Sequence, residues 1–123
     1  MISLSQNEVE ALKILWEHGE LKPAQIQERF SRSIDNGTLR STLMNLVHKK
    51  HVARRQEGKA FFYSARVPKT TVLKSWMRSL ADIFAQGSTR ELVAQLTETE
   101  DLTPEDLKFL QNVAAAKASK KQK

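Results

Sequence analysis

The feature that most constrains this chain is the order of its predicted elements, three short amphipathic helices followed at once by a β-hairpin. Apolar residues recur at helical spacing over residues 6–18, 23–30 and 38–50. Two short runs rich in β-branched and aromatic residues follow, residues 52–56 and 61–65, and Gly58 can form the turn between them. This order is typical of a winged helix-turn-helix domain. We therefore predict a mainly α fold with a small β-hairpin wing.

Local signals fix most of the helix ends. Ser5-Gln6-Asn7-Glu8 is a capping box that starts the first helix, and Gly19 favours its end. Pro23 suits the first position of the second helix. Asp35 or Asn36 can cap the third helix, and the sequence does not decide between them.

The third helix has a polar face opposite its apolar one. Leu39, Leu43, Leu46 and Val47 share one face and predict the buried side. Base edges in the major groove of B-DNA present a distinct pattern of donors and acceptors, which short polar side chains and arginine can read. We expect four outer residues to contact bases: Thr38, Arg40, Ser41 and Asn45. Four further cations are expected to neutralise phosphates on either side: Lys49, Arg54, Arg55 and Lys59.

Charge supports a polyanionic partner. Residues 36–66 carry seven lysines and arginines and one acidic residue, a net charge of +6, whereas residues 1–35 have a net charge of −2. A localised basic block of this kind is typical of a surface that binds double-stranded DNA. Two alternatives stay open, a solvated basic face and a winged-helix protein-interaction module that does not bind DNA.

The C-terminal part is predicted to form three more helices, over residues 69–85, 88–97 and 104–116. Such short helices have little surface to bury against one another, so we expect a second copy to cover their apolar faces. The alternative is that these faces fold back on the N-terminal domain. The residues expected in the dimer interface are Val72, Trp76, Leu80, Ile83, Phe84, Leu92, Val93, Leu96, Leu107 and Leu110.

These patterns predict three regions. Residues 1–68 form the winged-helix DNA-binding domain, residues 69–116 form the helical dimerisation region, and residues 117–123 form a flexible basic tail. The chain has no cysteine, which excludes disulfides and thiolate metal sites. No signal peptide or membrane-spanning run is present, so we expect a soluble, cytoplasmic protein without a membrane partner.

The sequence carries no sign of an enzyme. It lacks the glycine-rich phosphate-binding motifs and the paired-histidine zinc motif. His48 and His51 can share a face at the end of the third helix, but a metal would need further ligands. We therefore predict no catalytic residue, no metal and no cofactor.

Several segments resemble the penicillinase-repressor family, the BlaI/MecI/CopY transcriptional repressors. Leu15-Trp16 resembles the end of the family's first helix, Thr38-Leu39-Arg40-Ser41-Thr42-Leu43 its recognition helix, Glu57-Gly58-Lys59 and Phe62-Tyr63 its wing, and Leu102-Thr103-Pro104-Glu105-Asp106-Leu107 the start of its last helix. The resemblance spans about residues 3–116. It implies a homodimer that represses transcription from a pseudo-palindromic operator, with Thr38, Arg40 and Ser41 near base edges and the C-terminal helices at the dimer interface.

The chain also departs from this family. Members inactivated by proteolysis are cleaved at an Asn-Phe bond, and here the matching stretch is Val93-Ala94-Gln95-Leu96. The copper-responsive members bind metal through C-terminal cysteines, which this chain lacks. Gly37 stands where relatives often have lysine, and Asn45 where they often have arginine, so a different operator sequence is expected. The sequence identifies no inducing signal, upstream sensor or protease.

Overall fold

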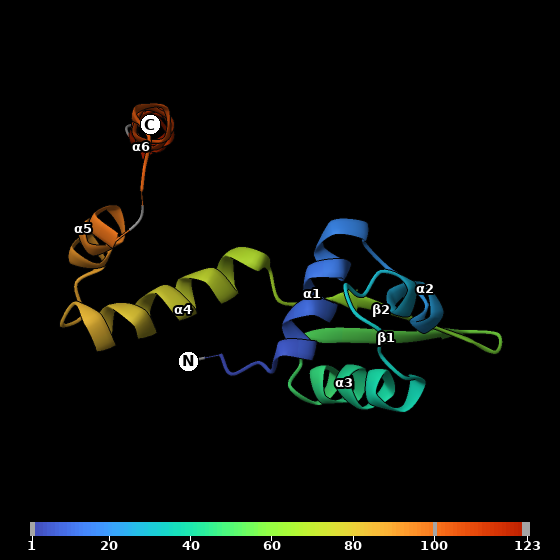
Figure 1. Cartoon of the computed structure of the whole chain (residues 1–123). Coiled ribbons are helices and arrows are strands. Elements are labelled where there is room, and N and C mark those ends of the chain that lie inside the picture. The colour runs from blue at the N-terminus through green and yellow to red at the C-terminus, as the bar shows by residue number, and fades with distance from the viewer. Residues whose placement is uncertain (1, 100, 122–123) are drawn as a thin grey trace. The chain divides into compact units, whose positions relative to one another are not determined.

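The computed structural model describes residues 2–99 and 101–121, and its contacts divide the chain into two compact units, residues 1–77 and 78–123. The first unit holds α1 (Gln6–His18), α2 (Pro23–Glu28), α3 (Asn36–His48), β1 (Val52–Glu57), β2 (Ala60–Ala65) and the start of α4 (Lys69–Phe84). The second unit holds the end of α4, α5 (Thr89–Thr99) and α6 (Pro104–Lys121) (Figure 1). The predicted fold, mainly α with a small hairpin, is confirmed.

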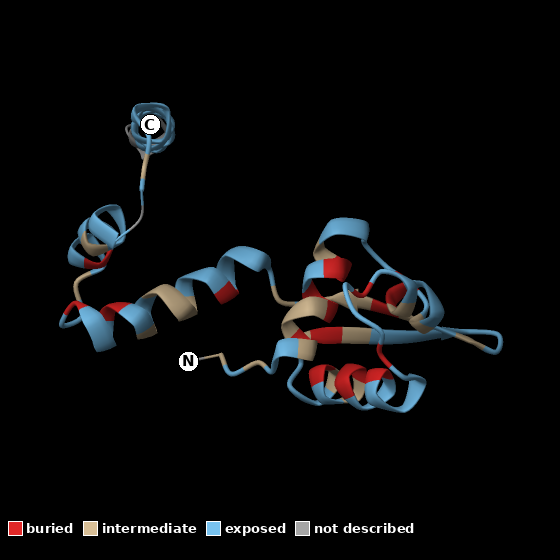
Figure 2. Ribbon diagram, viewed as in Figure 1, coloured by how far each residue is buried: buried red, intermediate tan, exposed pale blue. Residues whose placement is uncertain are grey.

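A single apolar core joins the three N-terminal helices to the hairpin. α3 packs against α1, α2 and β1, and the apolar stripe predicted for it lies in this core (Figure 2). Leu39, Leu43 and Leu46 are each 0% exposed. Burying one such side chain stabilises a fold by about 1.5–3 kcal/mol. The core therefore fixes which face of α3 points outward.

Capping side chains set the first residues of α1 and α3. The Ser5 hydroxyl accepts the Glu8 backbone N–H at 3.2 Å, and the Glu8 carboxylate accepts the Ser5 N–H at 2.8 Å. The sequence left open whether Asp35 or Asn36 caps α3. In the structure the cap is Asp35, whose carboxylate accepts the Thr38 N–H at 3.1 Å. The helix begins at Asn36, two residues before the predicted start.

The hairpin is held to the body of the unit at its base. β1 and β2 pair antiparallel, with Val52 opposite Ala65 and Glu57 opposite Ala60, and Gly58 at a φ of 62° makes the turn. Leu21, just before α2, exchanges two backbone hydrogen bonds of 3.0 and 2.8 Å with Tyr63. The base of the hairpin is thus fixed, while its tip extends away from the helices (Figure 1).

The first compact unit ends later than the predicted domain boundary at residue 68. Val72, on α4, is 4% exposed and faces the same pocket as Leu4, Val9 and Trp16. The Trp76 indole N–H donates to the Ile2 carbonyl at 2.9 Å. Pro68 therefore marks the start of a helix, and the first turns of that helix still belong to the N-terminal unit.

In the second unit, Ala81, Ala85 and Leu92 are buried where the end of α4 meets α5. α6 is helical to Lys121, past the end predicted at residue 116, because alanine and lysine favour helix. Residues 117–121, which the sequence analysis places in a flexible tail, belong to this helix, and residues 122–123 lie outside the described part of the chain. No described helix is long and apolar enough to cross a membrane.

Candidate nucleic-acid interface

The outer face of α3 is polar and open to solvent, as the sequence predicts. Thr38, Arg40, Ser41 and Asn45 are all exposed, because the core holds the opposite face of the helix. Thr42 lies between these faces and is buried, and its hydroxyl donates to the Thr38 carbonyl at 2.8 Å. The backbone thus carries the four predicted base-contacting side chains on one accessible surface.

Thr38 also has a structural role that the sequence did not indicate. Its hydroxyl donates to the Asp35 carboxylate, which accepts the Thr38 backbone N–H as well. These hydrogen bonds from Thr38 lower the pKa of Asp35. Since the hydroxyl proton is used in the cap, the remaining capacity of Thr38 toward a base is to accept a hydrogen bond.

Lys49 is exposed, but its ammonium group is paired within the chain. Its Nζ donates to both carboxylate oxygens of Glu8 at 2.9 Å, and to the Ser3 carbonyl at 3.0 Å. Glu8 is 4% exposed, so its charge requires a partner inside the protein. The ammonium group of Lys49 therefore compensates a buried carboxylate, a role that the sequence analysis did not give it.

Arg55 is also compensated within the chain. It donates to both carboxylate oxygens of Glu20, at 2.6 and 2.8 Å, and to Glu57 at 2.8 Å. Its guanidinium lies 4.4 Å from the centre of the Phe62 ring. The hydrogen bonds that Arg55 donates to Glu20 and Glu57 raise the pKa of Arg55. Two carboxylates of the same chain therefore compensate the positive charge of Arg55, which was expected to neutralise a DNA phosphate.

Arg54, the neighbouring cation, stands on the other face of the strand. Its guanidinium lies 4.8 Å from the centre of the Phe61 ring, and its Nη1 lies 3.5 Å from the Met44 sulfur. Arg54 and Arg40 line a recess of about 290 Å³ between α3 and the hairpin, together with Pro23, Met44, Phe61 and Tyr63. The described lining of this recess contains two cations and no carboxylate.

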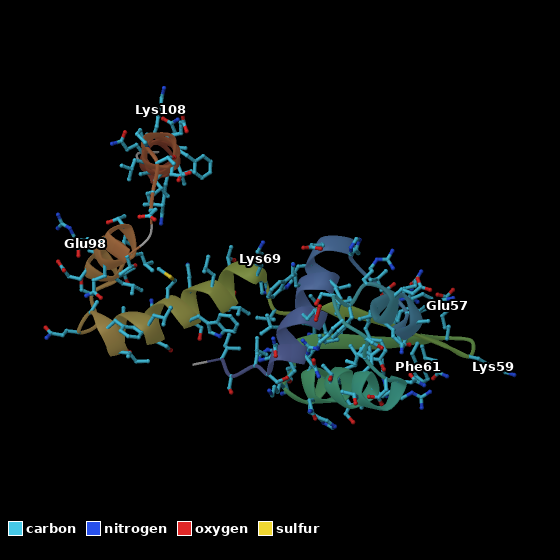
Figure 3. The ribbon with its side chains drawn as sticks, in the orientation of Figure 1. Glu57, Lys59, Phe61, Lys69, Glu98 and Lys108 are labelled. Atoms are coloured by element: carbon cyan, nitrogen blue, oxygen red, sulfur yellow. The ribbon has the colours of Figure 1, made fainter. Side chains whose placement is uncertain are left out.

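The recess is a feature that sequence reasoning missed. Met44 and Phe61 were not candidate site residues, although they support Arg54. The alternation along β2 places Phe61 and Tyr63 on one face, which was the available signal. Lys59 lies exposed at the hairpin tip, as predicted (Figure 3).

Three predicted interface residues of the C-terminal helices are not on an open surface. Val72 and Leu92 are each 4% exposed, and Trp76 is half-buried with its indole N–H bound to Ile2. Neighbouring parts of the same chain already cover Val72 and Leu92, so these two side chains offer little surface to a second copy. Seven predicted residues are exposed: Leu80, Ile83, Phe84, Val93, Leu96, Leu107 and Leu110.

On the described part of the C-terminal helices, three further large apolar side chains are exposed that were not among the predicted interface residues: Leu73, Phe109 and Val113. Their helical spacing was visible in the sequence, but which of them lies on the open side depends on packing. Among residues 2–99 and 101–121, no three histidine, aspartate or glutamate side chains are grouped to hold a metal ion.

The model of the penicillinase repressor family matches residues 4–116, from before α1 into α6. The chain belongs to the penicillinase repressor family. The penicillinase repressor of Bacillus licheniformis is 20% identical over 112 residues, covering 89% of this chain and 88% of that protein. An uncharacterised 16.5 kDa protein of Latilactobacillus sakei is 24% identical over 118 residues, covering 94% of this chain and 81% of that protein.

Solved structures show the same fold. The DNA-binding domain of the repressor BlaI superposes with a TM-score of 0.51 at 21% identity, covering 55% of this chain and 85% of that domain. MepR of Staphylococcus aureus, a transcription regulator of a multidrug efflux pump, superposes with a TM-score of 0.54 at 16% identity, covering 96% and 80%. This penicillinase repressor family member is therefore a winged-helix transcription regulator, and the resemblance inferred from the sequence is confirmed.

Proposed function

We propose that this chain is a sequence-specific DNA-binding repressor that acts as a homodimer on a pseudo-palindromic operator. The observation that carries the proposal is the open polar face of α3. Arg40 lies on this face and also lines the recess beside the hairpin. An α-helix of this kind fits the major groove of B-DNA. Blocking transcription is the role that the name of the family implies.

Each exposed side chain of α3 suits a particular contact. Arg40 is free to approach the O6 and N7 atoms of a guanine with both guanidinium nitrogens, and Asn45 can pair with adenine. Ser41 can donate to either purine. Arg54 and Lys59 then neutralise phosphates of the flanking backbone. Lys49 and Arg55 are left out of this set, since carboxylates of the chain already compensate both.

The dimer is proposed from the apolar surface of the second unit. Ile83 is 71% exposed, Phe84 60%, and Phe109 66%. Exposed aromatic and aliphatic side chains at this density are typical of an interface, and an obligate dimer buries roughly 2,000 Å² or more. A two-fold dimer also places two copies of α3 on half-sites about one helical turn apart.

Selection from a random duplex library with the purified protein tests this proposal. We expect the retained sequences to share a two-fold symmetric motif. Enrichment of duplex DNA without any motif would contradict sequence-specific binding. A flat titration with duplex DNA at low salt would favour the alternative function, a protein-interaction module.

Two variants separate base reading from charge. Arg40→Ala is expected to weaken binding to the selected site by about 1–3 kcal/mol and to affect random duplex much less. Lys59→Ala is the matched control, because it also removes one exposed cation. It should weaken binding to both DNAs similarly and reduce the slope of log K against log salt by about 0.9. Equal losses on both DNAs for Arg40→Ala would exclude a base-reading role.

A further inference from the structure

A second pocket lies in the N-terminal unit and has no part in the proposed DNA contacts. It encloses about 180 Å³ between α1 and the first turns of α4, and its exposed lining is entirely apolar. Trp16 and Trp76 form two of its walls, with Leu4, Val9, Val72, Leu73 and the aliphatic stem of Lys69 as the others. Its apolar lining is typical of a ligand site, and its volume, below the roughly 300–1,000 Å³ of pockets for drug-sized ligands, restricts it to a compact molecule.

The polar atoms of both tryptophans are satisfied outside the pocket. The Trp16 indole N–H donates to the Val67 carbonyl at 2.9 Å, and that of Trp76 donates to the Ile2 carbonyl at 2.9 Å. The apolar ring surfaces are thus left to line the pocket without an unpaired donor. Water in such a space finds few hydrogen-bond partners, so an apolar ring displaces it favourably.

The pocket is also held in shape before any ligand arrives. The Ile2 N–H donates to the Ser75 hydroxyl at 2.8 Å, which ties the segment before α1 to α4. Leu4, in that segment, packs against the core. A site with preformed walls loses less free energy in ordering when a ligand binds.

Size and charge define the ligand class. An apolar cavity of about 150 Å³ binds benzene, so a pocket of this volume accommodates one six-membered ring. Lys69 is exposed and is the one charged residue among the described residues that line the pocket (Figure 3). We propose that this pocket binds a small aromatic carboxylate, with the ring between the tryptophans and the carboxylate beside Lys69. This ligand site goes beyond the proposed function and does not depend on it.

Tryptophan signals test the proposal directly, because the chain has two tryptophans and both line the pocket. Benzoate is the probe, and the indole N–H resonances of the full-length protein are followed by NMR. We expect both resonances to shift saturably, with a dissociation constant on the order of 1 mM. The absence of any saturable shift up to about 20 mM benzoate would overturn the proposal.

The role of Lys69 is tested separately. Lys69→Met keeps the apolar stem. We expect it to weaken the affinity for benzoate about two- to fivefold, the usual range for losing an exposed ion pair, and to leave the affinity for neutral benzyl alcohol unchanged. Lys74→Met, an exposed position on α4 outside the lining, is the matched control and should change neither. Unchanged benzoate affinity in Lys69→Met would refute the carboxylate contact.

A second variant tests the apolar wall. Leu73 is 58% exposed, so Leu73→Glu is compatible with folding. The new carboxylate should weaken the affinity for benzoate by about tenfold or more. Thermal unfolding checks that the variant is folded. Indole shifts that depend on protein concentration instead of benzoate would mean that a second copy covers the pocket, and the ligand site would be rejected.

Discussion

Lys49 extends from the end of α3 to the start of α1, where its Nζ lies 2.9 Å from both carboxylate oxygens of Glu8. Glu8 belongs to the capping box of α1, so one buried carboxylate both caps that helix and fixes the end of α3. The same lysine binds the Ser3 carbonyl. Lys49 therefore acts in the fold, although its place in the basic block suggested a DNA contact.

Lys49→Met is expected to lower the free energy of unfolding by about 1–2 kcal/mol. This is less than the loss for a fully buried ion pair, because Lys49 itself remains 39% exposed. Urea unfolding measures the loss, with Lys50→Met as the control, since Lys50 is an exposed neighbour. The salt dependence of DNA binding should stay that of the wild type. A stable variant with a weaker salt dependence would restore the phosphate role.

The Glu8 carboxylate also predicts how stability depends on pH. Burial raises the pKa of Glu8, but hydrogen bonds from Ser5 and Lys49 outweigh it and hold the pKa below its ordinary value of 4.5. A lowered pKa in the folded state stabilises the protein above pH 4.5, and this contribution is lost as the pH falls through the folded-state pKa.

Glu8→Gln keeps an acceptor for the Ser5 N–H and removes this titration. The variant should be less stable than the wild type at pH 7, and the difference should narrow below about pH 4.5. Thermal unfolding of both proteins from pH 7 to about pH 3 measures it. A difference that is constant across this range would show that the carboxylate charge is not responsible.

The pairing of Arg55 predicts that removing carboxylates strengthens DNA binding. In Glu20→Gln combined with Glu57→Gln, the guanidinium of Arg55 loses the two negative charges that compensate it and becomes available to phosphate. We expect tighter binding to random duplex and a salt slope steeper by up to about 0.9. Glu17→Gln combined with Glu28→Gln removes the same charge at exposed positions on α1 and α2 that do not pair with Arg55. An equal gain in DNA affinity in this control would show that the change in net charge alone explains the effect.

Ile83→Asp is expected to weaken the proposed dimer by about a hundredfold or more. A two-fold interface contains the substitution twice, and burying each isoleucine contributes about 1.5–3 kcal/mol. Sedimentation equilibrium measures the change, and Thr71→Asp, an exposed position on α4, is the control. Ile83→Asp with unchanged self-association would place the dimer interface elsewhere.

Local signals in the sequence were enough for most of the fold. The Ser5–Glu8 capping box, the apolar stripe ending at Leu46 and the turn at Gly58 each act within a few residues, so their outcome hardly depends on the rest of the chain. The same holds for the outer face of α3. Once Leu39 and Leu43 are buried, Arg40 must point outward.

The pairs Lys49–Glu8 and Arg55–Glu20 could not be predicted, because their members lie far apart in the sequence. Lys49 and Glu8 are separated by 41 positions, and Arg55 and Glu20 by 35. A count of cations treats Lys49, Arg54 and Arg55 alike. Only tertiary packing decides that Arg54 stacks on Phe61 beside the recess. The same packing pairs Lys49 and Arg55 with carboxylates.

The apolar stripe of α4 shows the same division. The sequence alone determined that one face of this helix is apolar, because that depends only on the spacing of Val72, Trp76, Leu80 and Ile83. What covers the face was decided by tertiary structure. Val72 packs into the N-terminal unit and Trp76 binds Ile2, 74 positions earlier, whereas Ile83 stays exposed. Periodicity specifies which side chains share a face, and only long-range contacts specify which of them are covered and by what.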